Sequence, residues 1–423
     1  MLRFNRKIFI HLFFFLVILS IICMGCKNKE NTDKKLEIFT WWTTGGEVDG
    51  LNEMYKIYKR RYPDIEIVNA VVAGGAGINA KAVLKTRMQE GDPPDSFQVH
   101  AGRGLIESWV VLDKIEPITF IFKENNNFEA YPKGLIDIIS YKGEIFSVPV
   151  NIHRSNVLWY NKKIFNENGL TPPQTIEELF KLSETLKAKG ITPIALGDKE
   201  IWVAVHILEN ILLGIMGEDN YKGLWNTKKL WKNPDIEKVL INYVRMMKFV
   251  NKDHSALDWQ GASQYIIDGK CAMMVMGDWA EGYFKSKGLT PNKEFGWKPF
   301  PDTSGAFLML SDSFCVPKNA KNRNAAINWL ALCASKEGQD AFNPQKGSIP
   351  ARVDTNENLY DEYLASAMRD FKKDIIVPSV AHGATASEVW LKEIESAMAS
   401  FLSDLNIEKA FNKLSEIAEK NIK

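Results

Sequence analysis

Cysteine is scarce in this sequence, and its spacing argues against a metal centre. Only five cysteines occur in 423 residues, and two of them, Cys23 and Cys26, lie close to the N-terminus. The other three, Cys271, Cys315 and Cys333, show neither Cys-x-x-Cys nor Cys/His spacing. Because an odd number permits at most one disulfide, we expect buried free thiols. No metal site and no thiol nucleophile are therefore predicted.

The chain also lacks an excess of charge of either sign. Its 53 basic and 52 acidic residues give a net charge of +1. A near-neutral chain offers no electrostatic footprint for nucleic acid. A phosphate loop is missing too, because Lys81-Ala82 stands where the glycine run at 74–77 would need Gly-Lys-Ser/Thr. We predict no nucleic-acid partner and no cofactor.

A long hydrophobic run occurs at residues 8–24, directly after Arg3, Arg6 and Lys7. Basic residues followed by such a run predict a secretory signal. The run ends at Gly25-Cys26, as bacterial lipoprotein signals do, which makes residues 1–25 a signal peptide and Cys26 the lipid-bearing first residue. Residues 26–35 are polar and aperiodic and predict a flexible tether. The exported chain is then held by lipid in the periplasm or at the outer face of the cytoplasmic membrane.

An uncleaved membrane anchor is the alternative for this segment. An apolar run of about 17 residues lies at the lower limit for a spanning helix. Ile22-Cys23-Met24-Gly25 also departs from the usual Leu-Ser/Ala-Gly/Ala pattern at the position three before the cysteine. We favour lipidation on Cys26.

The remaining chain of some 400 residues exceeds what one core usually serves, so two domains are expected. Strand and helix patterns alternate at its beginning, with a strand at 36–40, a helix from Glu47 to Tyr62, a strand at 65–72, a helix at 78–90 and a strand at 96–100. This order predicts a parallel sheet with helices on its faces. The fold class is therefore α/β.

Two adjacent tryptophans, Trp41 and Trp42, follow the first predicted strand, and Glu47 opens the helix after them. Ligands of open α/β sheets bind in the crevice outside the carboxyl ends of the strands. Aromatic rings there can face the C–H side of a sugar while a carboxylate accepts its hydroxyls. The alternative is that both rings are packing residues, since adjacent side chains of a strand point in opposite directions and only one need enter the core.

Several segments together resemble a known family. They are 41–47, the glycine run 74–77, Gly91-Asp92-Pro93-Pro94-Asp95, 98–100, Val148-Pro149-Val150-Asn151, Gly277-Asp278-Trp279, 311–318 and Gly347-Ser348-Ile349-Pro350. The chain resembles the bacterial extracellular solute-binding proteins of family 1, in particular the glucose/mannose-type sugar-binding lipoproteins of ABC importers. Cys315 and the residues before Cys26 depart from the pattern.

The resemblance implies a two-lobed periplasmic-binding-protein-like fold of type II, the maltose-binding-protein-like type, with the ligand cleft between the lobes. Such a protein is a monomer without enzymatic activity that captures a neutral sugar and delivers it to the transmembrane subunits of a permease. A polar break at 151–156 inside a β-rich run, and return crossings at 304–312 and near 349–351, divide the chain. We assign 36–150 and 306–350 to the first lobe, and 151–305 and 351–423 to the second. Helical patterns dominate 177–251, so the second lobe is expected to be the more helical one.

The resemblance also implies the residues that hydrogen-bond sugar hydroxyls. Their chemistry fits, because a hydroxyl both donates and accepts. Trp259, in a segment that looks like a polar loop, and Trp279, at a strand end, are further candidates, and Asp278 is alternatively the cap of the helix that follows. By themselves Asp312, Lys346 and His382 look like solvated charges in short loops. The full set of candidate ligand-binding residues is Trp41, Trp42, Glu47, Gln98, His100, Asn151, Trp259, Trp279, Asp312, Lys346 and His382, with His153 beside Asn151 as a weaker candidate.

Two other classes of function stay open at this point. A glycoside hydrolase would need two carboxylates flanking the scissile bond, and Glu47, Asp278 and Asp312 could supply them, although nothing in the sequence brings an acid and a base together. An adhesin or structural lipoprotein would neither cleave nor retain sugar. Within the binding class, glucose or mannose is the expected ligand, with galactose or a disaccharide as alternatives.

Overall fold

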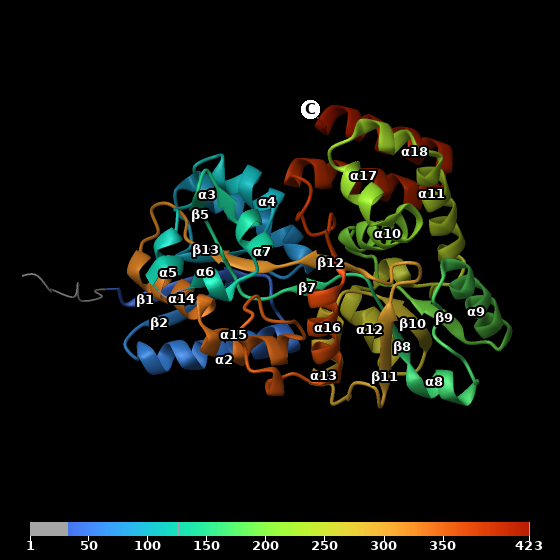
Figure 1. The fold of residues 1–423 in the computed structure, drawn as a ribbon, viewed down its shortest axis with the longest axis horizontal. Helices are drawn as coiled ribbons and strands as arrows, with labels where there is room; N and C mark the ends of the chain where they lie inside the picture. The colour runs from blue at the N-terminus through green and yellow to red at the C-terminus, as the bar shows by residue number, and fades with distance from the viewer. Residues whose placement is uncertain (1–32, 125–126, 423) are drawn as a thin grey trace, which may run out of the picture.

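The computed structural model describes residues 33–124 and 127–422, which form two α/β lobes lying side by side (Figure 1). The predicted signal peptide and the lipidation site Cys26 lie outside the described residues. Within those residues, every helix is too short or too polar to cross a bilayer. Cys271, Cys315 and Cys333 are buried free thiols, as expected.

The first lobe is built on a five-stranded sheet. In sheet order its strands are β2 (Glu66–Val71), β1 (Lys35–Thr40), β3 (Ser96–His100), β13 (Asp312–Cys315) and β6 (Val148–Pro149). β1 runs parallel to β2 and β3, while β13 is antiparallel to β3. Helices α2 (Gly46–Arg61) and α3 (Ile78–Glu90) connect the three parallel strands. The alternation of strands and helices predicted for this part of the chain is confirmed.

The second lobe contains a four-stranded sheet and more helix. Its strands in sheet order are β11 (Phe295–Pro299), β8 (Val157–Asn161), β10 (Cys271–Val275) and β9 (Thr192–Ala195). Its helices include α8 (Lys162–Glu167), α9 (Ile176–Ala188), α10 (Trp202–Leu224), α11 (Pro234–Met247), α12 (Trp259–Ile267) and α13 (Trp279–Ser286). The expected dominance of helix over 177–251 is confirmed by α9, α10 and α11, and β9, which pairs parallel with β10, is a short strand that the sequence did not indicate. Four residues are too few for periodicity to separate a strand from helix.

A third sheet lies between the lobes (Figure 1). It consists of β14 (Ile375–Pro378), β12 (Ala306–Leu310) and β7 (His153–Arg154), with β12 parallel to β14 and antiparallel to β7. The crossing segments also bind one another, because Ile152 pairs with Ile349 in an isolated bridge and the Asp312 amide donates to Asn151 Oδ1 at 2.8 Å. The predicted lobe bounds stay a prediction, and β12, which they place in the first lobe, belongs to this connecting sheet.

The remaining elements complete the two lobes. In the first half of the chain they are η1 (Gly75–Gly77), α4 (Arg103–Leu105), η2 (Ile106–Val110), α5 (Thr119–Glu124), α6 (Asn127–Ala130), α7 (Lys133–Ile138), β4 (Ser140–Tyr141) and β5 (Glu144–Ile145). Later come η3 (Lys228–Lys232), η4 (His254–Ala256), α14 (Arg323–Ala334), α15 (Lys336–Lys346), η5 (Glu357–Leu359), α16 (Glu362–Lys373), α17 (Glu388–Asp404) and α18 (Ile407–Asn421).

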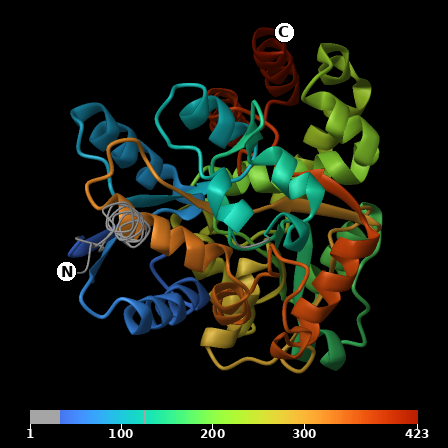
Figure 2. The same ribbon diagram turned by 60° about the vertical axis from the view of Figure 1, so that its left-hand side comes forward.

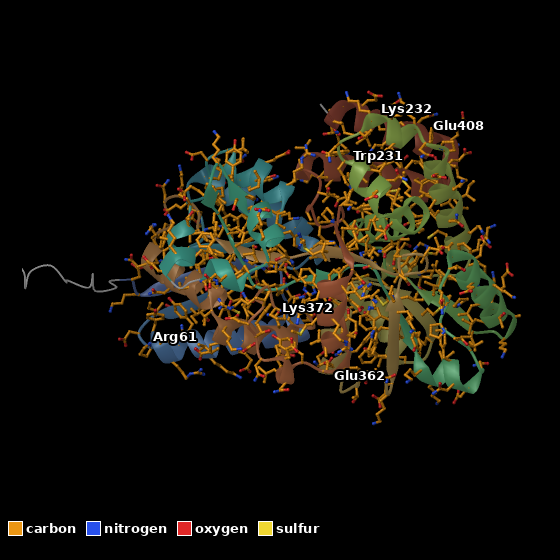
Figure 3. The ribbon with its side chains drawn as sticks, in the orientation of Figure 1. Arg61, Trp231, Lys232, Glu362, Lys372 and Glu408 are labelled. Atoms are coloured by element: carbon orange, nitrogen blue, oxygen red, sulfur yellow. The ribbon has the colours of Figure 1, made fainter. Side chains whose placement is uncertain are left out.

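Segments from opposite ends of the sequence pack together in this arrangement. Helix α15, which comes late in the sequence, lies against helix α2, which comes early in the sequence, in both ribbon views (Figures 1 and 2). A Cβ on Gly50 of α2 would lie 2.8 Å from the backbone oxygen of Phe342 in α15, so the two helices touch closely. Polar side chains such as Arg61 and Lys232 lie at the exposed outer ends of the molecule, while the neighbouring Trp231 is buried (Figure 3). The α2–α15 contact places the N-terminus of one helix beside the C-terminus of the other.

Candidate functional site

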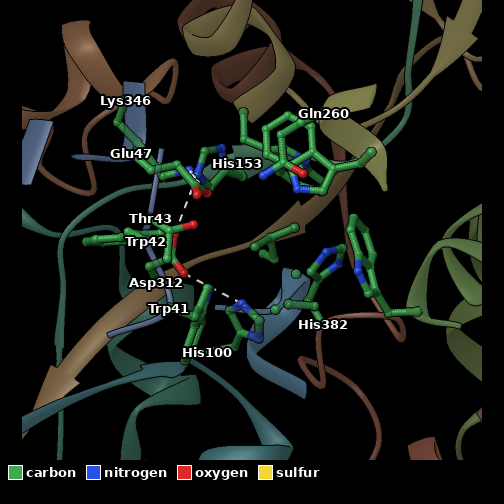
Figure 4. Close-up of a pocket in the computed structure, with 17 residues that line it drawn as sticks. Trp41, Trp42, Thr43, Glu47, His100, His153, Gln260, Asp312, Lys346 and His382 are labelled. Carbon is green, nitrogen blue, oxygen red and sulfur yellow. Dashed lines mark hydrogen bonds and ion pairs between the residues drawn. The ribbon is translucent and has the colours of Figure 1, made fainter. Parts of the chain in front are cut away.

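A pocket of about 490 Å³ lies between the two lobes (Figure 4). This volume includes solvent space at the mouth of the pocket. All the predicted ligand-binding residues except Gln98 and Asn151 line the pocket. Its walls are formed by Trp41, Trp42, Thr43, Glu47, Gly74, Gly75, Ala76, His100, His153, Trp202, Trp259, Gln260, Trp279, Leu310, Asp312, Lys346 and His382.

The two tryptophans after β1 form the first-lobe wall. Both are buried and both line the pocket. Trp42 packs on Phe314 and Phe342 at ring-centroid distances of 5.8 and 5.0 Å, whereas Trp41 meets the edge of His100 at 5.1 Å. Each tryptophan thus packs against its neighbours and also faces the pocket. Each ring is held by its neighbours with little freedom left to lose when a ligand binds.

The opposite wall comes from the second lobe and is also aromatic. His382 contacts the rings of Trp279 and Trp202 at centroid distances of 5.1 and 5.6 Å, and those two rings are 6.0 Å apart. Trp202 was not foreseen from the sequence. It begins α10, a nearly continuous apolar run in which a tryptophan looks like core. A pocket-facing role could not be read from that pattern.

Trp259 lines the pocket, but the polar loop predicted around it was wrong. The residue begins α12, and only 4% of its surface is exposed. Asp258 is the N-cap of this helix, since its Oδ1 accepts a hydrogen bond from the Gly261 amide at 2.8 Å. An aspartate directly before an apolar-periodic stretch is a recognised helix-start signal, so the helix could have been predicted.

Asp312 is the central polar group of the pocket, and it lies in strand β13 rather than in a loop. Its Oδ1 accepts from Gln98 Nε2 and its Oδ2 from Asn151 Nδ2, each at 2.9 Å. The sequence predicted that Gln98 and Asn151 bind the ligand, but neither residue lines the pocket. They lie behind Asp312 and fix its carboxylate, because each of its oxygens already has a buried partner.

Two histidines flank the same carboxylate. His100 Nε2 and His153 Nε2 lie 3.5 Å from Asp312 Oδ1 and Oδ2, respectively (Figure 4). Burial raises the pKa of Asp312, but the hydrogen bond with His153 and the nearby positive charges lower it by more, so this carboxyl is ionised. Burial lowers the pKa of His100 to about 3, which leaves its ring neutral at pH 7. A neutral imidazole can both donate and accept hydrogen bonds.

His153 differs because a second carboxylate holds its other nitrogen. Its Nδ1 contacts Asp278 Oδ1, and burial and Lys346 lower its pKa less than Asp278 and Asp312 raise it. The alternative that Asp278 caps α13 was wrong, since its side chain makes no cap hydrogen bond. Asp278 Oδ2 instead accepts from the Arg154 amide at 2.9 Å. The carboxylate lies behind the pocket wall and is fully buried.

Glu47 and Lys346 form a buried ion pair at one end of the pocket. Glu47 lies in the first turn of α2, and Lys346 Nζ approaches its Oε1 at 3.3 Å. Lys346 was predicted in a loop without an ionic partner, and both expectations were wrong. It is the last residue of α15, and Gly347, with φ of 78°, supplies the left-handed C-cap. Burial raises the pKa of Glu47, and Lys346 opposes that shift.

His382 is presented by the loop between β14 and α17. Its Nδ1 lies 2.9 Å from Ser379 Oγ, and that hydroxyl donates to the fully buried carboxylate of Glu209. Burial and the neighbouring histidines lower the pKa of His382 well below its usual range. The ring is neutral at pH 7. Because the Ser379 hydroxyl donates its proton to Glu209, His382 Nδ1 carries the ring proton and donates to Ser379 Oγ, which leaves Nε2 as a hydrogen-bond acceptor.

The pocket combines aromatic walls with polar groups of both kinds. In Figure 4 the Glu47–Lys346 pair and the His100 ring lie at opposite ends, with Asp312 between them. The charged groups are matched with each other, so the pocket does not demand a charged ligand. Such an arrangement suits an uncharged molecule that carries many hydroxyls on a flat apolar ring.

One known protein family matches most of the chain. The family model described as "Bacterial extracellular solute-binding protein" matches residues 44–340. The chain belongs to this family. Membership in the glucose/mannose-type subgroup stays a prediction.

Two relatives and one solved structure extend this assignment. The chain is 35% identical over 420 residues to an uncharacterized ABC transporter extracellular-binding protein of Pyrococcus horikoshii, covering 96% of this chain and 94% of that one. It is 30% identical over 366 residues to a probable sugar-binding periplasmic protein of Brucella suis, covering 85% of each. The bacterial solute receptor AcbH, whose structure is described with an exclusive preference for β-D-galactopyranose, superimposes with a TM-score of 0.80 at 16% identity, covering 91% of this chain and 97% of that one. The predicted two-lobed fold is confirmed.

Proposed function

We propose that this solute-binding protein is the sugar-binding component of an ABC importer. It captures a neutral monosaccharide such as glucose or mannose between its lobes and delivers it, as a monomer, to the membrane-spanning permease subunits. The observation that carries the proposal is the pocket itself, with tryptophans from both lobes around hydroxyl-binding groups. The sugar-binding description of the Brucella suis relative supports the same ligand class.

The shape of the pocket favours a small sugar. The buried Glu47–Lys346 pair limits one end, and the edge-to-face pair of His100 and His382, with ring centroids 5.4 Å apart, limits the other. A single pyranose ring between them would place hydroxyls near both ends and near Asp312. Galactose and disaccharides are the competing ligands, since a few side chains in such a pocket decide between them.

The site also favours retention over hydrolysis. A glycosidase needs one carboxyl as acid and another as base or nucleophile. Asp278 does not line the pocket, Asp312 has partners on both oxygens, and Glu47 is paired with Lys346. None of the three is free to attack a sugar or to activate a water.

Attachment to the membrane rests on the sequence alone. Lipidation of Cys26 after removal of residues 1–25 would leave residues 27–32 as a short tether. The predicted end of the tether at Lys35 was wrong, because Asp33 and Lys34 already hydrogen-bond the first lobe and β1 begins at Lys35. The protein would then work in the periplasm or at the outer face of the cytoplasmic membrane. A family of extracellular binding proteins is consistent with export.

Native mass spectrometry and calorimetry test the proposal. Protein purified without refolding is weighed for carried-over ligand and then titrated with glucose, mannose, galactose and maltose. We expect stoichiometric binding of one monosaccharide and recovery of intact sugar. Trp41→Leu should weaken binding, while Trp297→Leu on β11, outside the pocket, should not. Turnover of a di- or oligosaccharide, or binding that Trp41→Leu leaves unchanged, would contradict the proposal.

A further inference from the structure

A contact beside the pocket joins the two lobes through a residue that does not line it. The glycine-rich loop Gly74–Gly77 belongs to the first lobe, between β2 and α3. Its Gly75 amide donates to Glu200 Oε2 of the second lobe at 2.8 Å. The same oxygen accepts from Trp202 Nε1 at 3.0 Å. One carboxylate oxygen therefore links the loop to a tryptophan of the opposite wall.

The loop fits tightly between aromatic rings of both lobes. A Cβ on Gly77 would lie 2.7 Å from the ring of Trp41, and one on Gly75 would lie 2.4 Å from Trp202 Nε1. Gly74, Ala76 and Gly77 have φ of 141°, 50° and 73°, so the backbone leaves the usual regions at three of four positions. For Ala76 this conformation is unfavourable by itself. Contacts from outside the loop must therefore hold it in place.

We propose that Glu200 is a clasp residue that retains the ligand by fastening the Gly74–Gly77 loop over the pocket. The inference rests on the proposed function, because it needs a ligand enclosed between the lobes. Glu200 touches no pocket space itself, so it acts by positioning the loop and Trp202, which do.

The clasp should act on release rather than on capture. Its bond from the Gly75 amide exists only while the lobes are together, so it contributes nothing to the open state that a ligand enters. Opening must break it before an enclosed ligand can leave. Affinity differences between related binding sites reside mostly in the dissociation rate, and a hydrogen bond to a charged group at this position is expected to change that rate about tenfold.

Stopped-flow fluorescence on the full chain tests this with Glu200→Ala. The probe is whichever of glucose, mannose and galactose binds the wild type most tightly. Glu184→Ala, at an exposed glutamate of α9, is the matched control. We expect Glu200→Ala to dissociate about tenfold faster, with the association rate and the ligand-free melting temperature unchanged. An unchanged dissociation rate, or an equal loss in the association rate, would overturn the clasp.

Gly75→Ala gives an independent variant. Gly75 lacks a positive φ, so alanine is tolerated by the backbone, but its Cβ would lie 2.4 Å from Trp202 Nε1 and 2.5 Å from Glu200 Oε2, the two groups that the clasp joins. This substitution should also speed dissociation, and its effect should be smaller in the Glu200→Ala background because the carboxylate is gone. If the effects of Gly75→Ala and Glu200→Ala on the dissociation rate are additive, the two residues do not act through the same contact, and the clasp is refuted.

Hydrogen exchange separates this proposal from the proposed function. With the probe sugar at saturation, amide exchange at residues 74–77 should be faster in Glu200→Ala than in the wild type, while exchange in the core strand β3 should be the same. Equal exchange of the loop in the two sugar-saturated proteins overturns the clasp even though sugar binds. A wild type that binds none of the sugars in calorimetry refutes the proposed ligand, and the clasp, which needs an enclosed ligand, falls with it.

Discussion

Replacing Lys346 by methionine tests the polar end of the pocket in two independent ways. The ammonium group is 2% exposed, lies 3.3 Å from Glu47 Oε1 and stands 5.7 Å from the ring centroid of Trp42. The ammonium group can therefore donate hydrogen bonds both to the Glu47 carboxylate and to an oxygen of the ligand. Methionine keeps most of the volume of the side chain and removes its charge and its hydrogen-bond donors.

The effect on stability follows from burial of the pair. Removing one partner of a buried ion pair typically costs about 3–5 kcal/mol, because the other charge is left uncompensated. The pKa of Glu47 is already raised by burial, and without Lys346 the carboxyl can take up a proton. Protonation limits the loss, so we expect the lower end of this range at pH 7 and a smaller loss at pH 5.

The effect on binding is a separate quantity. A hydrogen bond from a charged donor contributes about 1.5–3 kcal/mol. Its loss corresponds to roughly 10- to 150-fold weaker sugar binding. The ion pair therefore predicts both weaker binding and a loss of stability.

Calorimetry with the cognate sugar and urea unfolding measure the two effects. Lys372→Met, at an exposed lysine of α16 whose ionic partner is also exposed, is the control and should change neither. The double variant Lys346→Met/Glu47→Gln should recover much of the stability, because neither charge of this pair is left without its partner. It should still bind sugar weakly. Unchanged affinity in Lys346→Met would remove this lysine from the site, and a double variant no more stable than the single one would refute the ion-pair reasoning.

Two further predictions concern attachment and closure. Cys26→Ala should release the protein from the membrane fraction, because stable anchoring needs several acyl chains; a mutant that stays bound after a carbonate wash would favour the uncleaved helix. Saturating sugar should reduce the radius of gyration in small-angle scattering and stabilise the fold by about 2.7 kcal/mol at a hundredfold excess over the dissociation constant. A melting shift at constant radius would mean that the ligand contacts only one lobe.

Much of the first lobe could be predicted because its signals are local. Helix α3 begins and ends at the residues expected from the sequence, since Gly77 precedes it and Gly91, with φ of 75°, caps it. The capping box of Thr175 and Glu178 at the start of α9 was likewise readable. Strand β9 was missed because its four residues are too few for a strand period to be recognised.

The site was predicted residue by residue but not as an arrangement. The family resemblance placed Gln98 beside the ligand. It could not show that a second layer of amides holds Asp312, since Gln98 and Asp312 are 214 positions apart and meet only through the pairing of β3 with β13. The ion pair between Glu47 and Lys346 spans 299 positions and was invisible for the same reason.

The buried histidines predict how stability depends on pH. In the folded protein the pKa of His100 is lowered to about 3, against about 6.5 when unfolded. Between pH 3 and 6.5 the His100 side chain is protonated in the unfolded chain but not in the folded protein. The contribution of His100 to the free energy of unfolding is therefore complete above pH 6.5 and is lost as the pH falls towards 3. The slope is about 1.4 kcal/mol per pH unit for each such histidine. His382 acts in the same direction, while the raised pKa values of Glu47 and His153 act in the opposite direction.

Because several groups contribute, the informative quantity is the difference between the wild type and His100→Asn. Asparagine keeps hydrogen-bonding capacity near Asp312 but does not titrate. Urea unfolding at pH 6.5, 5.5 and 4.5 should show the variant losing about 1.4 kcal/mol less per pH unit than the wild type. If both proteins lose stability in parallel, His100 must take up its proton in the folded state at an ordinary pH. The imidazole would then be a cation in mildly acidic solution, able only to donate to a sugar, and its assignment as a dual donor and acceptor would be wrong.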